Sequence, residues 1–166
     1  MAIGTIIENY AMEVLGTSYF VGEFHRSMDE KGRLAIPPAW RAKTNEPALG
    51  VHLLALPTPD GNITVYPPKM IEQLESRISQ ISIGDLEGQR AITELMSLAH
   101  SFSCDKQGRI HLNERLMQHA QIEKGVVLVG KLSTFSIFSE VRYASFQSSY
   151  LGGQSESAEV FKRFGL

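Results

Sequence analysis

The chain has few of the features that mark secreted or membrane-spanning proteins. It contains 1 cysteine, Cys104, in 166 residues, so it cannot form an intrachain disulfide, which fits a reducing compartment. No apolar run approaches the roughly 18 residues of a membrane-spanning helix. The first residues lack the basic segment and long apolar stretch of a secretory signal. We therefore expect a cytoplasmic protein without a membrane partner.

Strong net charge and familiar catalytic motifs are also missing. The formal net charge is −2, so the whole chain offers no attraction to a polyanion, and any such site must be local. The apolar share of 43% and the charged share of 20% are typical of a folded domain. No P-loop, dinucleotide fingerprint or G-x-S-x-G motif occurs. We expect no enzymatic activity, no cofactor and no small-molecule substrate.

The most informative feature that is present is a repeated pattern, D-x-x-G-R. It occurs at residues 29–33 and 105–109, and the copies are 105 − 29 = 76 positions apart. Each copy is followed by a short apolar strand, a helix-start residue (Pro37 or Asn113), a short helix and two hairpin strands. The sequence therefore predicts two tandem units of strand, turn, strand, short helix and hairpin. No low-complexity linker separates them, so we expect one compact body.

Each copy has the chemistry of a tight turn that holds an arginine. An Asp at the first turn position accepts hydrogen bonds from the next backbone N–H groups, and a Gly at the fourth adopts positive φ without steric cost. The predicted turn-forming residues are Asp29, Gly32, Asp105 and Gly108. Arg33 and Arg109 directly follow these glycines, so we expect each turn to direct an arginine outward from a fixed backbone.

Basic residues are more frequent around the first copy than around the second. Residues 25–43 contain five basic and two acidic side chains, whereas 104–124 contain four basic and three acidic ones. Arginine matches guanine or phosphate with two parallel hydrogen bonds, and Lys31 and Lys106 could reach a phosphate from within the turns. Arg26 adds to the first basic cluster. The alternative is a pair of ordinary solvated turns that a duplication has preserved for folding.

Several other patterns indicate structure rather than chemistry. Apolar residues at helical spacing predict helices over 70–81 and 86–99, and a third helix is expected over 140–151. Trp40 and the stripe Ile71, Leu74 and Ile78 are predicted to belong to the core. His100 and Cys104 are four residues apart, but two candidate ligands do not make a zinc site, so we expect no metal. The first residues (Ile6, Ile7, Tyr10, Val14) form either an amphipathic helix that docks on a neighbouring subunit or a frayed terminus.

The segments MDEKGRLAIPPAWR, SCDKQGRI and KGVVLVGKLSTFSIF resemble the MraZ family of bacterial transcriptional regulators. This family is related to AbrB-type swapped-hairpin DNA-binding proteins, and the resemblance extends over about 20–146. It implies a mostly β fold with helices (α+β), in which two tandem AbrB-like half-domains form a pseudo-twofold, double-psi or swapped-hairpin β-barrel-like unit. On this basis we expect an N-terminal extension (1–19), a first unit (20–69), a helical connector (70–99), a second unit (100–143) and a C-terminal helical tail (144–166).

The resemblance also implies a function. It indicates a ring-shaped homo-oligomer, cytoplasmic and nucleoid-associated, that binds double-stranded DNA at direct-repeat boxes in its own promoter, upstream of a division and cell-wall gene cluster. The resemblance assigns DNA contact to Arg33 and Arg109 with Lys31 beside them, and local charge adds Lys106 and Arg26. Three departures are residues 1–18, which precede the usual start of the family, Asn113, which replaces a frequent proline, and the mild charge of the second unit, which leaves open whether Arg109 contributes as much as Arg33. The alternative function is an oligomeric protein-interaction scaffold or antitoxin-like module without specific DNA binding.

Overall fold

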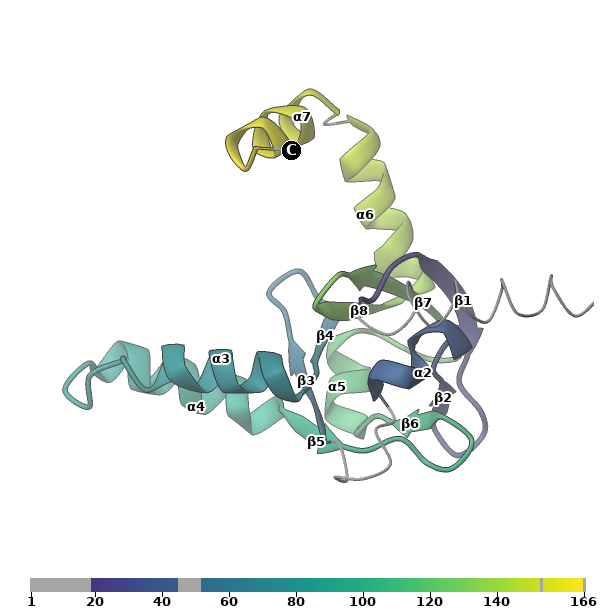
Figure 1. Cartoon of the computed structure of the whole chain (residues 1–166), viewed down its shortest axis with the longest axis horizontal. Helices are drawn as coiled ribbons and strands as arrows, with labels where there is room; N and C mark the ends of the chain where they lie inside the picture. Colours follow the sequence, from purple (N-terminus) through teal and green to yellow (C-terminus); the bar gives the residue numbers. More distant parts are fainter. Residues whose placement is uncertain (1–18, 45–51, 153, 166) are drawn as a thin grey trace, which may run out of the picture.

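The computed structural model describes residues 19–44, 52–152 and 154–165. The predicted N-terminal helix lies outside these residues. In chain order the elements are β1 (Glu23–Ser27), β2 (Arg33–Ala35), α2 (Pro38–Thr44), β3 (Leu53–Pro57), β4 (Ile63–Tyr66), α3 (Pro68–Ile78), α4 (Leu86–Leu98), β5 (His100–Phe102), β6 (Arg109–His111), α5 (Glu114–His119), β7 (Gly125–Lys131), β8 (Thr134–Ser139), α6 (Glu140–Gly152) and α7 (Gln154–Arg163). This succession confirms a mixed α+β fold, shown in Figure 1.

The main sheet has six strands whose order reflects the sequence repeat. The order is β1-β7-β8-β4-β3-β5, and every neighbouring pair is antiparallel. Exchanging the strands of the first half (β1 to β4) for those of the second (β5 to β8) reproduces the same order in reverse. The first strand of each half therefore pairs with the hairpin of the other half. The two halves are joined by strand exchange instead of lying side by side.

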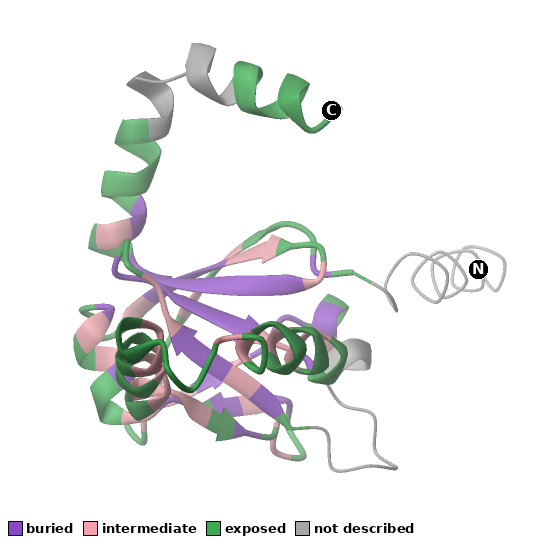
Figure 2. Ribbon diagram, turned by 90° about the vertical axis from the view of Figure 1, so that its left-hand side faces the viewer, coloured by how far each residue is buried: buried purple, intermediate pink, exposed green. Residues whose placement is uncertain are grey.

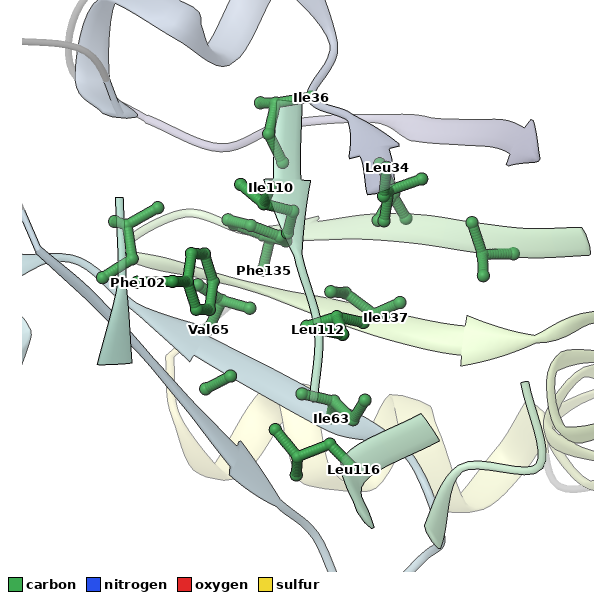
Figure 3. Close-up of a cluster of buried hydrophobic side chains, with 14 of the residues drawn as sticks. Leu34, Ile36, Ile63, Val65, Phe102, Ile110, Leu112, Leu116, Phe135 and Ile137 are labelled. Atoms are coloured by element: carbon green, nitrogen blue, oxygen red, sulfur yellow. The ribbon is translucent and has the colours of Figure 1, made fainter. Parts of the chain in front are cut away.

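A second sheet consists only of β2 and β6, one strand from each half. In this two-stranded ribbon Leu34 lies opposite Ile110, and both side chains are buried, with exposed fractions of 0% and 1%. Figure 3 shows both of them in the buried cluster with Phe135 and Ile137 of β8. Since side chains alternate along a strand, the residues before and after Leu34 and Ile110 face away from the core.

The hydrophobic core takes side chains from both halves. One continuous cluster joins Trp40 of α2 and Leu116 of α5, which are 116 − 40 = 76 positions apart and equivalent in the repeat. Trp40 packs against the rings of Phe20 and Phe135 at centroid distances of 5.4 and 5.1 Å. The predictions of a core Trp40 and of one compact body are therefore confirmed. The buried strands of this body occupy the centre of Figure 2.

The helices α3 and α4 form a hairpin that projects from the body (Figure 1), and here the sequence prediction is wrong. Ile71, Leu74 and Ile78 were expected in the core, but no residue of α3 or α4 is buried. Their apolar stripes are half-buried. A hairpin that projects from the body buries such a stripe only in part, although the helical spacing itself is correctly predicted.

The chain ends in two consecutive helices that lead away from the body (Figure 1). The start of α6 is held by Tyr143, which is 8% exposed and donates a hydrogen bond to the Glu23 carboxylate of β1. Further along, Phe146, Phe161 and Phe164 are exposed, at 48%, 47% and 73%. The helix predicted over 140–151 is therefore confirmed. Within the described residues, no helix has the length and apolar character needed to cross a bilayer.

Candidate nucleic-acid interface

The first D-x-x-G-R segment forms the tight turn that its sequence predicts. The Asp29 Oδ1 atom accepts hydrogen bonds from the backbone N–H groups of Lys31 and Arg33, both at 2.9 Å. The N–H of Gly32 donates to the carbonyl oxygen of Asp29 at 3.0 Å, and Gly32 has φ = +72°. An L-residue with a side chain adopts such a φ only at a cost, which explains the glycine.

The second copy has the same geometry. Asp105 Oδ1 accepts hydrogen bonds from the N–H groups of Gln107 and Arg109, again at 2.9 Å. Gly108 has the same φ of +72°, and its N–H donates to Asp105 at 2.9 Å. Two segments 76 residues apart thus fold into matching turns, because the Asp and Gly of each copy supply the same acceptor and the same conformational freedom.

The sequence predicted that each turn directs its arginine outward. In the structure, however, the motif arginines are not free at the tips of the turns. The Arg33 Nε atom donates to Asp29 Oδ2 at 2.7 Å, and Arg109 Nε donates to Asp105 Oδ2 at 2.8 Å. Their side chains are 31% and 28% exposed. Each guanidinium is therefore held by the carboxylate of its own turn through the Nε edge. The terminal nitrogens form the other edge of the fork, which is the one that can meet a partner.

These contacts stabilise the ionised form of both turn aspartates. The pKa of Asp29 is lowered chiefly by the hydrogen bond from the Arg33 backbone N–H, and further by the Arg33 side chain. The pKa of Asp105 is lowered in the same way by Arg109. Both carboxylates are therefore charged at neutral pH, and each holds its arginine in place as a charge-assisted pair.

The two arginines lie on one common surface, the outer face of the β2–β6 ribbon. Arg33 is opposite His111 in the register, and Ala35 is opposite Arg109. Because cross-strand partners point to the same side, these four residues share the face that is turned away from the buried Leu34 and Ile110 pair. The two arginines occupy diagonal positions, for which Cβ atoms are typically about 7–8 Å apart. We call this four-residue surface the ribbon face.

The predicted lysines lie beside the ribbon face, whereas Arg26 does not belong to it. Lys31 and Lys106 are exposed within their turns. Arg26 is in β1, a strand of the main sheet, and its guanidinium lies 5.6 Å from the ring centroid of Phe24. It also donates a hydrogen bond to the His25 carbonyl at 3.0 Å. The structure thus brings together four of the five predicted DNA-contact residues around the ribbon.

The surroundings of the first turn are more acidic than the sequence suggests. A groove of about 670 Å³ lies beside it, and α5 of the second half supplies part of its wall. The charged residues that line this groove are Asp29, Glu30, Glu114, Glu123 and Lys124. The turn that belongs to the more basic stretch of sequence is therefore bordered by carboxylates from the other half of the chain.

The second turn is covered by a basic residue from the first half. Arg41 of α2 lies over Gly108, where an added Cβ would come within 2.6 Å of the Arg41 Nε. This nitrogen donates to the Ile36 carbonyl at 3.2 Å. Its equivalent in the repeat, Met117, lines the groove at the first turn. The short helix of each half lies beside the turn of the other half. A count of charges along the sequence therefore cannot show which charged residues surround each turn.

Sequence reasoning missed two residues of this region, His111 and Arg41. The sequence analysis assigned no role to His111, although its position 111 − 35 = 76 residues after Ala35 placed it in the repeat. Cross-strand pairing of the two copies would have shown it opposite Arg33. Among the described residues, no cluster of three or more His, Cys, Asp or Glu side chains could hold a metal ion.

Comparison with known proteins defines the class to which this fold and turn pair belong. Curated proteins named "Transcriptional regulator MraZ" are similar to the chain over most of its length. The protein from Haemophilus influenzae is 36% identical over 126 residues, which are 75% of this chain and 82% of the relative. The one from Lachnoclostridium phytofermentans is 33% identical over 89% of this chain and 98% of the relative. That from Actinobacillus pleuropneumoniae is 32% identical over 89% and 99%.

A family model described as "MraZ protein, putative antitoxin-like" matches residues 95–164. This segment contains the second turn, the β7–β8 hairpin and both C-terminal helices. The chain belongs to the MraZ family. The curated members of this family that match the chain are named transcriptional regulators. The resemblance seen in the sequence is therefore confirmed.

Proposed function

We propose that the chain is a sequence-specific DNA-binding transcriptional regulator that reads DNA with the ribbon face. The observation that carries this proposal is the convergence of Arg33 and Arg109, far apart in sequence, on one side of a two-stranded ribbon. The major groove of B-DNA, about 12 Å wide, admits a two-stranded β-ribbon. The Asp29 and Asp105 carboxylates fix the two guanidinium groups, which reduces the entropy lost on contact with guanine or phosphate.

The strand exchange between halves supports the finer prediction of the fold. In this interpretation the two halves are AbrB-like units related by a pseudo-twofold axis, in a swapped-hairpin, barrel-like arrangement. The expected boundaries are a first unit over 20–69 and a second over 100–143, with a connector between them and a tail after them. A pseudo-twofold ribbon at the junction of the units provides two related contact points for one DNA segment.

We further propose that the protein acts as a ring-shaped homo-oligomer on direct-repeat boxes in its own promoter, ahead of the division and cell-wall genes. One arginine–guanine pair contributes only about 1–3 kcal/mol, so useful affinity requires several subunits on adjacent boxes. A head-to-tail interface that closes gives a ring whose ribbon faces all have the same direction, which suits direct repeats. In this role the protein resides in the cytoplasm, at the nucleoid.

The test compares Arg33→Ala and Arg109→Ala with Arg90→Ala in gel shifts on the promoter DNA of the chain's own gene. Arg90 is an exposed arginine on α4, distant in the fold from the ribbon, so it is a matched control. Each ribbon variant should weaken binding and lower the salt slope by about one for each lost phosphate contact. Unchanged affinity and salt dependence in both ribbon variants would overturn the proposal.

The second candidate function is an assembly scaffold or antitoxin-like module, which the antitoxin-like description of the matching family model favours. Light scattering combined with the same gel shift separates the two functions. A homo-oligomer that binds random and promoter DNA equally weakly supports the scaffold. An oligomer that prefers the promoter duplex supports the regulator.

A further inference from the structure

The two ends of the ribbon face have equivalent backbones but different side chains. Arg33 is paired across the ribbon with His111, whereas Arg109 is paired with Ala35. His111 and Ala35 are equivalent positions of the repeat, since they are 76 residues apart. One end of the ribbon therefore carries an arginine and an imidazole, and the other carries an arginine and a methyl group. The ribbon is therefore symmetric in its backbone, but its two ends carry different side chains.

His111 is accessible and lies over the first turn. It is exposed, and an added Cβ at Gly32 would lie 3.6 Å from its Nε2 atom, an ordinary van der Waals distance. Its ring centroid is 6.4 Å from that of His100 in β5, and the two rings are almost perpendicular. The imidazole is thus positioned by the turn on one side and by a second histidine on the other, and it still reaches solvent.

Charges of both signs face His111. They are Arg33 across the ribbon, Arg109 on its own strand, His100 on β5, the carboxylates of Asp29, Glu30, Glu114 and Glu123, and the ammonium of Lys124. Burial lowers the pKa of His100, and the neighbouring His111 lowers it further. His100 Nδ1 is buried and has no hydrogen-bond partner among the described residues. Both effects favour the neutral form of His100, and of the two histidines His111 is the one that solvent and a ligand can reach.

We propose that His111 is a further DNA-contacting residue, at the Arg33 end of the ribbon, and that its protonation couples DNA binding to pH. The proposal rests on the function proposed above. A protonated imidazole donates two N–H groups, which match a phosphate oxygen or a base acceptor in the groove. Ala35 at the equivalent position can make no such bond. The added contact therefore exists at one end only, which gives each subunit a direction on its DNA box.

The sign of the pH effect follows from the charge of the partner. A phosphate backbone favours the charged form of an imidazole that it contacts. Binding to DNA then takes up a proton at this position, so affinity increases as the pH falls. The carboxylates of the groove also attract the protonated imidazole of His111. Binding to DNA therefore favours protonation only if the DNA places more negative charge near the ring than these carboxylates do.

Three proteins with different numbers of ribbon histidines provide the test. The wild type has one, His111→Ala has none, and Ala35→His has one at each end. Their affinities for a duplex of the chain's own promoter are measured at pH 6 and pH 8 at constant ionic strength. We expect the wild type to bind several-fold tighter at pH 6, the His111→Ala variant to change by less than about twofold, and the Ala35→His variant to respond more strongly than the wild type.

Two further proteins keep the outcome interpretable. His111→Gln retains a neutral polar side chain if alanine disturbs the turn, and it should also lose the pH response. His25→Ala removes an exposed histidine of β1 that lies outside the ribbon face, and it should keep the response. The same measurements on a duplex of unrelated sequence separate a base contact from a phosphate contact, since only a phosphate contact produces the effect on both.

Equal pH responses in the wild type and in both His111 variants would overturn this inference. The outcome would leave the proposed function intact if Arg33→Ala still weakens promoter binding at both pH values. Conversely, if Arg33→Ala and Arg109→Ala bind as the wild type does, the proposed function fails, whatever His111 does. The two failures are therefore distinguishable in one set of measurements.

Discussion

The two turns of the ribbon have matching backbones and different neighbours. Both contain a glycine at φ = +72° and an arginine bonded to the turn aspartate. Beside the first turn lies a groove with several carboxylates, whereas Arg41 covers the second. The difference arises because each half places its short helix against the turn of the other half. Duplication has thus preserved the local conformation while the surroundings of the copies have diverged.

The largest losses of stability in both halves are expected in the core, at the equivalent positions 40 and 116. Trp40→Ala removes a ring that contacts three aromatic side chains and leaves the Val21 carbonyl without its 3.1 Å hydrogen bond. We expect destabilisation of about 3–5 kcal/mol, against about 2–5 kcal/mol for Leu116→Ala. Denaturant midpoints measure both, with exposed Gln118→Ala as the control. A smaller loss for Trp40→Ala than for Leu116→Ala would contradict the ranking.

Substitutions of the turn glycines should cost less stability than those in the core. Gly32→Ala forces an L-residue into positive φ, which costs about 1–2 kcal/mol, and its Cβ meets His111 at an ordinary 3.6 Å. Gly108→Ala has the same backbone cost and also displaces Arg41 from its hydrogen bond to Ile36, which adds about 0.5–1.5 kcal/mol. Thermal unfolding of both variants tests the order. Equal stabilities would show that Arg41 moves without loss.

A helix cap distinguishes the short helices of the two halves. Asn113 Oδ1 accepts a hydrogen bond from the Leu116 N–H at 2.8 Å at the start of α5, where the first half has Pro37. Asn113→Ala should destabilise the protein by about 1 kcal/mol, and Asn113→Asp should retain the cap. Denaturation curves of the two variants give the comparison. If Asn113→Asp loses as much stability as Asn113→Ala, the missing cap hydrogen bond is not the cause of the destabilisation.

The turns should again behave alike in their response to acid. Both aspartates have a pKa below the ordinary value of 3.8, so each stabilises the folded state above that pH and loses this contribution as the pH falls through the lowered folded-state pKa. Asp29→Asn and Asp105→Asn should therefore flatten the decline in stability below about pH 4 by similar amounts. Unfolding at pH 2 to 6 measures this, and a flattening in one variant only would break the equivalence.

The sequence predicted the conformation of the two turns, but not which side chains of the other half lie beside them. Asp29, Gly32 and their second copies specify the turn by short-range chemistry, so both turns and the flanking strands could be predicted. The position of Arg41 over Gly108 depends on the exchange of strands and helices between halves, which no short-range pattern contains. The same reason explains why His111 was missed, since only the register of β2 with β6 places it opposite Arg33.

The helical hairpin shows a different limit of prediction. Ile71, Leu74 and Ile78 have the spacing of a buried stripe, and the helix α3 indeed forms. Periodicity gives the face of a helix but not the thickness of the layer that covers it. On a hairpin that projects from the body the stripe remains half-buried, and only the tertiary arrangement in Figure 1 distinguishes it from a core stripe.

The pairing of β1 with β7 has a consequence for the newly made chain. Glu23 pairs with Val129, which the ribosome adds 129 − 23 = 106 residues later. At synthesis rates of roughly 5–20 residues per second, β1 waits on the order of 5–20 s for its partner strand. Until then the edge of β1 that β7 covers has no partner within the chain, so the main sheet cannot be completed before the second half is synthesised.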